Sequence, residues 1–192
     1  MQSLFLVILL LTTSADATSH SKSTRKDLPK MKTESIVLAG GCFWGVQDII
    51  RKVAGVISTE VGYSGGFLDN PTYKDITKGT TGHAEAVRVT FDPTKVSLET
   101  VLDYFFRLHD PTTLNRQGND IGTQYRSLIL YADAEQRRIA EKKKQDVDKS
   151  GKWKKPLTTE IAELKKFYRA ESEHQDYLIK NPDGYTCHYL RN

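Results

Sequence analysis

Residues 35–53 read SIVLAGGCFWGVQDIIRKV, and this stretch decides the fold. The apolar run over residues 35–39 ends at two glycines, so we expect a short buried strand followed by a sharp turn. Apolar residues then recur at helical spacing from Phe43 onward, which predicts a helix that begins near Trp44. Cys42 would lie at the N-terminus of that helix, where unpaired N–H groups and the helix dipole favour an anion. A thiol in such a place tends to have a lowered pKa, and the thiolate is its reactive form. A buried, inert cysteine between core aromatics remains the alternative.

The composition indicates one globular domain without a strong charge bias. The chain has 192 residues and a formal net charge of +4, which is enough length for one well-buried core. The basic run Lys142–Lys144 could suggest a nucleic-acid surface. Acidic residues interrupt that region and no aromatic platform accompanies it, so we interpret it as a solvated helix face and expect no nucleic-acid partner.

The N-terminus has the pattern of a targeting segment. Residues 4–11 are a short apolar core, and Ala15-Asp16-Ala17 offers a small-x-small cleavage site, which predicts a signal peptide over residues 1–17. The apolar core is too short to span a bilayer, so we expect no membrane anchor. Residues 18–33 are rich in Ser, Thr and Lys and predict a disordered leader, with the folded domain over 34–192. We therefore expect an exported or secreted protein, or a cytoplasmic one if no signal peptide is cleaved.

Strand and helix signals alternate along the folded domain. Two β-α-β units are followed by a charged helix and a last strand, which favours an α+β fold built as a two-layer α/β sandwich with a mixed sheet. The segment 109–123 is rich in Pro, Asn, Gly and Asp, and a loop of that length is usually functional. A short helix is expected within 167–179. The expected strands lie over residues 35–39, 56–61, 83–91, 125–131 and 157–161.

Glu85 is a candidate proton donor. Strand alternation places it on the same face as Val87, Val89 and Phe91, where a carboxylate is costly, so its pKa should rise. A protonated carboxyl in such a site can act as a general acid, although a glutamate at a strand end can also reach solvent. The histidines match no compact metal motif, so we expect no metal site.

In this context, a series of motifs in order along the domain closely resembles the A-type methionine sulfoxide reductases, which reduce peptide methionine (S)-S-oxide. The motifs are Gly41-Cys42-Phe43-Trp44-Gly45, Gly62-Tyr63-Ser64-Gly65-Gly66, Asn70-Pro71-Thr72-Tyr73, Thr81-Gly82-His83-Ala84-Glu85, His109-Asp110-Pro111, Arg116-Gln117-Gly118-Asn119-Asp120, Gly122-Thr123-Gln124-Tyr125-Arg126-Ser127, Glu173-His174-Gln175-Asp176-Tyr177-Leu178 and Lys180-Asn181-Pro182.

The resemblance implies a role for each matching residue. Cys42 matches the nucleophile, which becomes a sulfenic acid, and Glu85 matches the acid. The residues that match the substrate site are Phe43 and Trp44, which hold the sulfoxide methyl group, Tyr73 and Tyr125, which bind the sulfoxide oxygen, and Asp120. The family fold has a ferredoxin-like, split β-α-β core, which agrees with the order of elements above. The resemblance also implies a thioredoxin-like external thiol reductant, no bound cofactor, and oxidised proteins or free methionine sulfoxide as substrate; we expect a monomer.

Cys187 is the sole candidate for a second redox cysteine, because the chain has only two cysteines. Some family members carry two recycling cysteines in a glycine-rich tail, whereas this chain ends in a short tail with Cys187 alone. His188 beside it could favour the thiolate. Two alternatives stay open: a non-enzymatic secreted domain stapled by a Cys42–Cys187 disulfide, and a cysteine hydrolase in which Cys42 works with a histidine.

Overall fold

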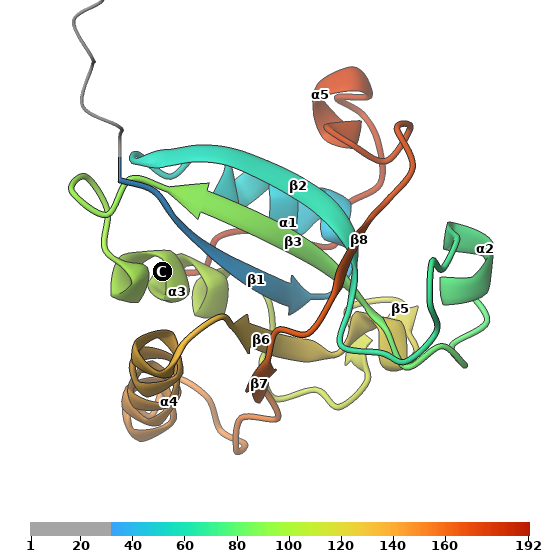
Figure 1. Ribbon diagram of the computed structural model, residues 1–192. Helices are drawn as coiled ribbons and strands as arrows, with labels where there is room; N and C mark the ends of the chain where they lie inside the picture. Colours follow the sequence, from blue (N-terminus) through green and yellow to red (C-terminus); the bar gives the residue numbers. More distant parts are fainter. Residues whose placement is uncertain (1–31) are drawn as a thin grey trace, which may run out of the picture. The chain divides into compact units, whose positions relative to one another are not determined.

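The computed structural model describes residues 32–192, and the signal peptide and most of the leader predicted from the sequence lie outside them (Figure 1). Its main feature is a six-stranded sheet. The strand order across the sheet is β7-β6-β1-β3-β2-β8. The strands are β1 (Glu34–Gly40), β2 (Val56–Ser64), β3 (Ala84–Phe91), β6 (Ser127–Tyr131), β7 (Glu160–Glu163) and β8 (Phe167–Arg169).

The sheet is mixed, as the sequence predicts. β1 lies between β3 and β6 and is antiparallel to both, β2 is antiparallel to β3 and β8, and only β6 and β7 run parallel. Helix α1 (Phe43–Ile50) connects β1 to β2, and α3 (Leu98–Leu108) connects β3 to β6. The two central connections therefore each skip one strand, in agreement with the expected split β-α-β core and α+β class.

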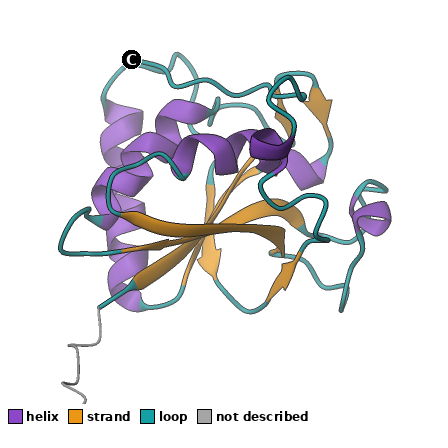
Figure 2. Ribbon diagram, turned by 90° about the horizontal axis from the view of Figure 1, so that it is seen from above, coloured by secondary structure: helices purple, strands orange, loops and turns teal. Residues whose placement is uncertain are grey.

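Three helices cover one face of the sheet (Figure 2). Residues of α1, α3 and α4 (Ala134–Lys149) join the inward residues of β1, β2, β3 and β6 in one hydrophobic core. Because side chains alternate along a strand, the other face presents a second set, a small cluster of Val, Ala and Leu side chains that Leu164 and Phe167 cover. Val87 and Val89 face the large core and Ala84 and Ala86 the small one, as strand alternation predicts.

A side chain caps the N-terminus of each long helix. Ser97 Oγ accepts a hydrogen bond from Thr100 N–H at 3.2 Å at the start of α3. Asp133 Oδ1 accepts one from Gln136 N–H at 2.8 Å at the start of α4. These side chains satisfy N–H groups that have no partner inside the helix.

The C-terminal third differs from the sequence prediction. Residues 167–169 form β8, a strand that was not predicted, because this segment pairs with the distant strand β2. The short helix expected within 167–179 is α5 (Tyr177–Lys180), at the end of that range. Tyr125 lies in the 3-10 helix η1 (Thr123–Tyr125) before β6 rather than in the strand. The predicted loop 109–123 contains a small hairpin, β4 (Arg116–Gln117) and β5 (Asp120–Ile121), and a short helix α2 (Tyr73–Ile76) follows Thr72.

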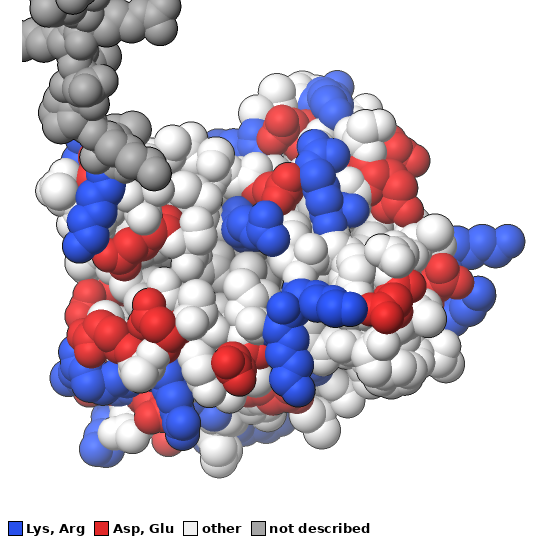
Figure 3. Space-filling model, in the orientation of Figure 1, with Lys and Arg blue, Asp and Glu red and all other residues white. Residues whose placement is uncertain are grey.

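The surface charges are mixed. Lys and Arg lie among Asp and Glu across the face drawn in Figure 3, with no broad area of one sign. In the basic run, Lys142 pairs with Asp146 and Lys143 with Asp103. Within residues 32–192 no helix combines the length and the apolar character needed to cross a bilayer.

Candidate active site

Cys42 is the N-cap residue of α1, directly after β1. Its carbonyl accepts the first helical hydrogen bond from Val46 N–H at 3.4 Å, and its side chain is only 6% exposed. The preceding Gly41 has φ +104°, and a Cβ there would lie 2.6 Å from Cβ of Gln117. A glycine is therefore required at position 41 for the backbone to turn and for Gln117 to pack against it.

The lowered pKa expected for Cys42 is wrong for this state of the molecule. Burial raises the pKa of the thiol well above its ordinary value, and the negative charge of Glu85 raises it further. The Trp44 N–H at the helix start acts in the expected direction, but it is the smaller effect. In the buried surroundings that the structure shows, the Cys42 side chain is consequently a neutral thiol.

Glu85 lies on β3 next to the start of α1. Its side chain is 2% exposed, and Oε2 accepts a hydrogen bond from Phe43 N–H at 3.0 Å. Burial raises the pKa of Glu85 to about 8, opposed by the Phe43 N–H and assisted by the charge of Asp120. Glu85 is thus mostly protonated at neutral pH, as the sequence predicts. Oε1 makes no hydrogen bond within the described residues, so it is the oxygen that can carry a proton toward a substrate.

Aromatic side chains surround the start of α1. Phe43 and Tyr73 stack with centroids 6.4 Å apart, and Trp44 stacks on Tyr177 at 3.8 Å. His174 joins this aromatic group, with its ring 4.3 Å from Tyr73 and 5.7 Å from Trp44. The resemblance pointed to Phe43, Trp44 and Tyr73, whereas no sequence pattern indicated that the segment 174–177 packs against them.

Tyr73 is held in place by a residue that sequence reasoning missed. Glu171 accepts hydrogen bonds from Tyr73 N–H at 2.8 Å and from the Tyr63 hydroxyl at 2.6 Å. Tyr63 is fully buried on β2, opposite Glu85 of β3. The Glu171 carboxylate therefore connects Tyr73 to the sheet.

Two phenols share the electrostatic surroundings of Cys42 and Glu85. Burial and then Glu85 and Cys42 raise the pKa of Tyr73 to about 12. Burial, Glu85 and Tyr73 raise the pKa of Tyr125 above its ordinary value. Both hydroxyls are protonated, and neither has a hydrogen-bond partner in the part of the chain that the structure describes. They are therefore free to donate to a ligand oxygen.

Asp120 and Cys187 lie side by side. Asp120 Oδ1 accepts from the Tyr185 hydroxyl at 3.1 Å, and Oδ2 lies 3.3 Å from Cys187 Sγ. Burial and the charge of Asp120 raise the pKa of Cys187 to about 11. Asp120 thus contacts the C-terminal tail (residues 185–192) as well as influencing the pKa values of Glu85 and Cys42.

The tail lies against the loop that carries Cys42. His188 Nε2 is 2.8 Å from the Gly40 carbonyl oxygen, and a Cβ on Gly45 would meet His188 Nδ1 and Thr186 Oγ1 at 2.5 Å each. Because Gly45 has no side chain, the tail can approach the backbone at the start of α1 closely. Both predicted redox cysteines consequently lie on neighbouring segments.

The open alternatives find little support in this geometry. Both cysteines are free thiols, so no disulfide staples the fold. No hydrogen bond joins Cys42 to a histidine within the described chain, as a cysteine hydrolase would require. Residues 32–192 also contain no group of three or more His, Cys, Asp or Glu side chains that could hold a metal ion.

Comparison with known proteins agrees with the site. A family model described as "Peptide methionine sulfoxide reductase" matches residues 34–192. The chain belongs to this family. A peptide methionine sulfoxide reductase MsrA of Nocardia farcinica is 55% identical over 159 residues, which cover 83% of this chain and 91% of the relative. As a family member, the protein is an oxidoreductase that reduces methionine sulfoxide.

Solved structures of the family share the fold of this reductase. Reduced Mxr1 from Saccharomyces cerevisiae is similar with a TM-score of 0.80 and 39% identity, over 84% of this chain and 93% of Mxr1. Mxr1 has also been solved in complex with Trx2, and that structure is similar with a TM-score of 0.58 and 28% identity, over 88% of this chain and 97% of the other.

Proposed function

We propose that this reductase acts on methionine (S)-sulfoxide, free or in oxidised proteins, with Cys42 as the nucleophile and Glu85 as the proton donor. The observation that carries the proposal is the Phe43 N–H···Glu85 hydrogen bond of 3.0 Å. This bond places a protonated, buried carboxyl beside the residue that follows Cys42. Burial of an acid with a single hydrogen bond costs stability, and buried groups with strongly shifted pKa values cluster at functional sites.

The surroundings of Cys42 suit the two ends of a sulfoxide. The methyl group is apolar and fits beside Phe43 and Trp44. The S=O oxygen is a strong acceptor, and Tyr73, Tyr125 and protonated Glu85 provide three hydroxyl donors for it. Because the sulfur is chiral, a pocket that fixes methyl and oxygen on different walls selects one epimer.

The reaction is balanced by these groups. The Cys42 sulfur attacks the sulfoxide sulfur as the oxygen receives a proton from Glu85, and the thiol proton of Cys42 restores the acid. The S–O bond of this adduct then breaks with a second proton and the oxygen leaves as water. A water molecule attacks the Cys42 sulfur, the S–S bond breaks, the sulfide leaves and the second proton is returned. The net result is R₂S=O plus Cys–SH giving R₂S plus Cys–SOH, in which the substrate sulfur is reduced by two electrons and Cys42 is oxidised by two.

Cys187 is proposed to resolve the Cys42 sulfenic acid to a disulfide. It is the only other thiol of the chain. Support comes from the tail's contact with Gly40 and Gly45 on both sides of Cys42. A thioredoxin-like protein would then reduce the disulfide, which the Mxr1 complex with Trx2 supports. No bound cofactor is needed for this cycle.

Export of the protein is a separate proposal that rests on residues 1–17. N-terminal sequencing of the natural protein tests it: a terminus at Thr18 is expected, and an intact Met1 or Gln2 terminus would refute export. An exported enzyme would need a thiol reductant of that compartment.

The decisive experiment for the reaction is a single turnover without reductant. The enzyme is mixed with pure (S)- or (R)-sulfoxide, and methionine, free thiols and Cys42–Cys187 disulfide are followed by mass spectrometry. We expect one methionine per enzyme from the (S) epimer, with loss of two thiols and a Cys42–Cys187 bond. In Cys187→Ser one methionine should still form, with Cys42 left as sulfenic acid. A Cys42 sulfenic acid beside a free Cys187 in the wild-type enzyme would refute the resolving role.

A further inference from the structure

The thiol of Cys187 has three acceptors within reach. Its Sγ lies 3.3 Å from Asp120 Oδ2, 3.5 Å from His188 Nδ1 and 3.8 Å from the Gln117 carbonyl oxygen. A thiol must lose its proton to act as a nucleophile. Cys187 is half-buried, and burial and Asp120 raise its pKa, so few thiolates form at neutral pH. A nearby acceptor that takes the proton during the reaction provides a faster route.

The hydrogen bonds of His188 fix its tautomer. Nε2 lies 2.8 Å from the Gly40 carbonyl oxygen. A carbonyl oxygen can only accept, so Nε2 carries the hydrogen and donates it. Burial lowers the pKa of His188, so the ring is neutral, and its remaining nitrogen, Nδ1, has a free lone pair. That lone pair is on the ring nitrogen that lies within reach of Cys187 Sγ.

We propose that His188 is the general base that removes the Cys187 proton when the Cys42–Cys187 disulfide forms. The inference rests on the proposed resolving role of Cys187. The Cys187 S–H bond breaks and its proton moves to His188 Nδ1. The sulfur electron pair forms the S–S bond to Cys42 while the Cys42 S–O bond breaks. Hydroxide leaves and takes the proton from His188 as water, so thiol and sulfenic acid together give disulfide and water without another oxidant.

His188 is a better base than Asp120 for this step. An imidazole is in general a stronger base than a carboxylate, and although burial lowers the pKa of His188, the hydrogen bond to Gly40 and the Asp120 carboxylate both act to raise it. The Asp120 charge opposes the formation of a thiolate, as its effect on Cys187 demonstrates. The same charge stabilises an imidazolium, because Asp120 raises the pKa of His188. Asp120 therefore stabilises the protonated His188 ring that the proton transfer produces.

Other charged groups around His188 act against its protonation. Arg191 lowers the pKa of His188. His109 lies close enough for the two rings to affect each other, and it is neutral because burial lowers its pKa to about 3. With Asp120 and Cys187, these are the titratable groups that face the ring. Before the reaction, His188 is therefore a neutral base beside the Asp120 carboxylate.

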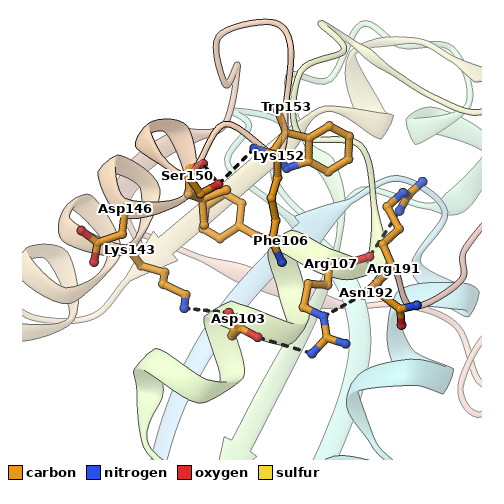
Figure 4. Close-up of a pocket in the computed structure, with 11 residues that line it drawn as sticks. Asp103, Phe106, Arg107, Lys143, Asp146, Ser150, Lys152, Trp153, Arg191 and Asn192 are labelled. Atoms are coloured by element: carbon orange, nitrogen blue, oxygen red, sulfur yellow. Dashed lines mark hydrogen bonds and ion pairs between the residues drawn. The ribbon is translucent and has the colours of Figure 1, made fainter.

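The tail is anchored on both sides of His188. Before it, the Tyr185 hydroxyl donates to Asp120 Oδ1 at 3.1 Å, and His188 N–H donates to Thr186 Oγ1 at 3.1 Å within the tail. Beyond it, Arg191 N–H donates to the Arg107 carbonyl at 3.0 Å, and Arg107 Nε donates to the Arg191 carbonyl at 2.7 Å. Arg107, Trp153 and Arg191 line a pocket of about 440 Å³ between α3 and α4, which Figure 4 shows. These contacts hold Nδ1 toward Cys187 rather than leaving the ring to rotate.

The test variant is His188→Gln. Its amide nitrogen can still donate to the Gly40 carbonyl, but the amide oxygen is not basic. In single turnovers with (S)-sulfoxide from pH 5.5 to 9.5, the time between methionine release and disulfide formation is measured by acid quench and mass spectrometry. A general base contributes about 10²–10⁴-fold, so disulfide formation at pH 7 should be at least ~100-fold slower and sulfenic acid should accumulate.

The pH profile separates a base from a structural residue. In the variant, disulfide formation should accelerate about tenfold per pH unit, because only thiolate formed by solvent can react. The wild-type rate should level off above the pKa of His188. Arg107→Ala is the matched control, because it removes the hydrogen bond to the Arg191 carbonyl and is not among the groups that shift the pKa of His188, so its deficit should be the same at every pH.

The outcomes are distinguishable. A His188→Gln rate equal to wild type, or a deficit that does not vary with pH, would overturn the role of His188 as base. Absence of a Cys42–Cys187 disulfide in the wild-type enzyme would instead overturn the proposed function of Cys187.

Discussion

The two cysteines of this reductase lie in contrasting surroundings. Cys42 is 6% exposed and sits between β1 and α1, so regular backbone holds it on both sides. Cys187 is half-buried in the tail, where residues 181–192 form no helix or strand, and side-chain contacts hold it. Regular structure therefore fixes Cys42, the thiol proposed to attack the substrate. Side-chain contacts that can break hold Cys187, the thiol proposed to react with Cys42 afterwards.

The contrast extends to how each thiol loses its proton. Cys42 lies beside Glu85, whose carboxyl is mostly protonated at neutral pH and whose ionisation raises the pKa of the thiol. Cys187 has a neutral imidazole with a free nitrogen. Four substitutions can break or sharpen this comparison, and they are ordered below from the largest expected effect.

Cys42→Ser is expected to abolish sulfoxide reduction, because a serine hydroxyl cannot accept the oxygen as a sulfenic acid. The fold should stay intact, since the change is close to isosteric. Activity is measured as methionine formed in a single turnover, with circular dichroism as the control for folding. Stoichiometric methionine from this variant would show that Cys42 is not the nucleophile.

Glu85→Gln is expected to lower the rate of methionine formation by about 10²–10⁴-fold, because the amide keeps the Phe43 hydrogen bond but supplies no acidic proton. The protonated form is the active one, so the wild-type rate should be constant below pH 8 and fall as the group with a pKa of about 8 ionises. The variant should lack this decline. Pre-steady-state rates from pH 6 to 10 test both points, and a wild-type profile without an alkaline limb would contradict the assignment.

Gly45→Ala is expected to separate the helix from the tail. Alanine favours a helix by up to ~1 kcal/mol over glycine, which offsets part of the packing cost of its Cβ, so the melting temperature should change little or fall slightly. Its Cβ would meet His188 and Thr186 at 2.5 Å, which displaces the tail. Such overpacking costs about 1–3 kcal/mol, so Cys42–Cys187 disulfide formation should slow by roughly tenfold or more. An unchanged disulfide rate would mean that the tail does not react from its docked position.

Arg107→Ala is expected to have the smallest effect. It removes the 2.7 Å hydrogen bond to the Arg191 carbonyl at the far end of the tail. One such bond contributes about 1 kcal/mol, so disulfide formation should slow by only about fivefold, equally at all pH values. Quench-flow rates measure it, with Arg138→Ala on the exposed face of α4 as a control. A decrease in the disulfide rate as large as that of Gly45→Ala would mean that the Arg107–Arg191 contact, and not the contact of the tail with Gly45, positions Cys187.

The sequence predicted those features that depend on neighbouring residues. The glycine pair before Cys42 and the helical spacing after it located the N-cap position, and strand alternation located Glu85 on the core face. It did not locate β8, because residues 167–169 become a strand only by pairing with β2, more than 100 residues earlier. Glu171 was missed for the same reason, since its role depends on Tyr63 and Tyr73 from distant elements.

The direction in which the pKa of Cys42 moves illustrates the limit of local reasoning about charge. The helix start was read from the sequence, and its effect is present in the structure. Burial and the Glu85 charge are larger, and both arise from packing between segments that the sequence does not place side by side. Local patterns thus indicated the candidate groups, whereas their contacts and the balance among them required the three-dimensional arrangement.

Glu85 also affects how the fold responds to alkali. Its pKa rises from 4.5 to about 8 on folding, so the native state holds a proton that the unfolded chain releases. The contribution of this group to stability is therefore complete below pH 4.5 and is lost as the pH rises toward 8. The loss is on the order of a few kcal/mol, since a tenfold change in proton affinity corresponds to about 1.4 kcal/mol. The acid that suits the chemistry consequently makes the native protein less resistant to unfolding at alkaline pH.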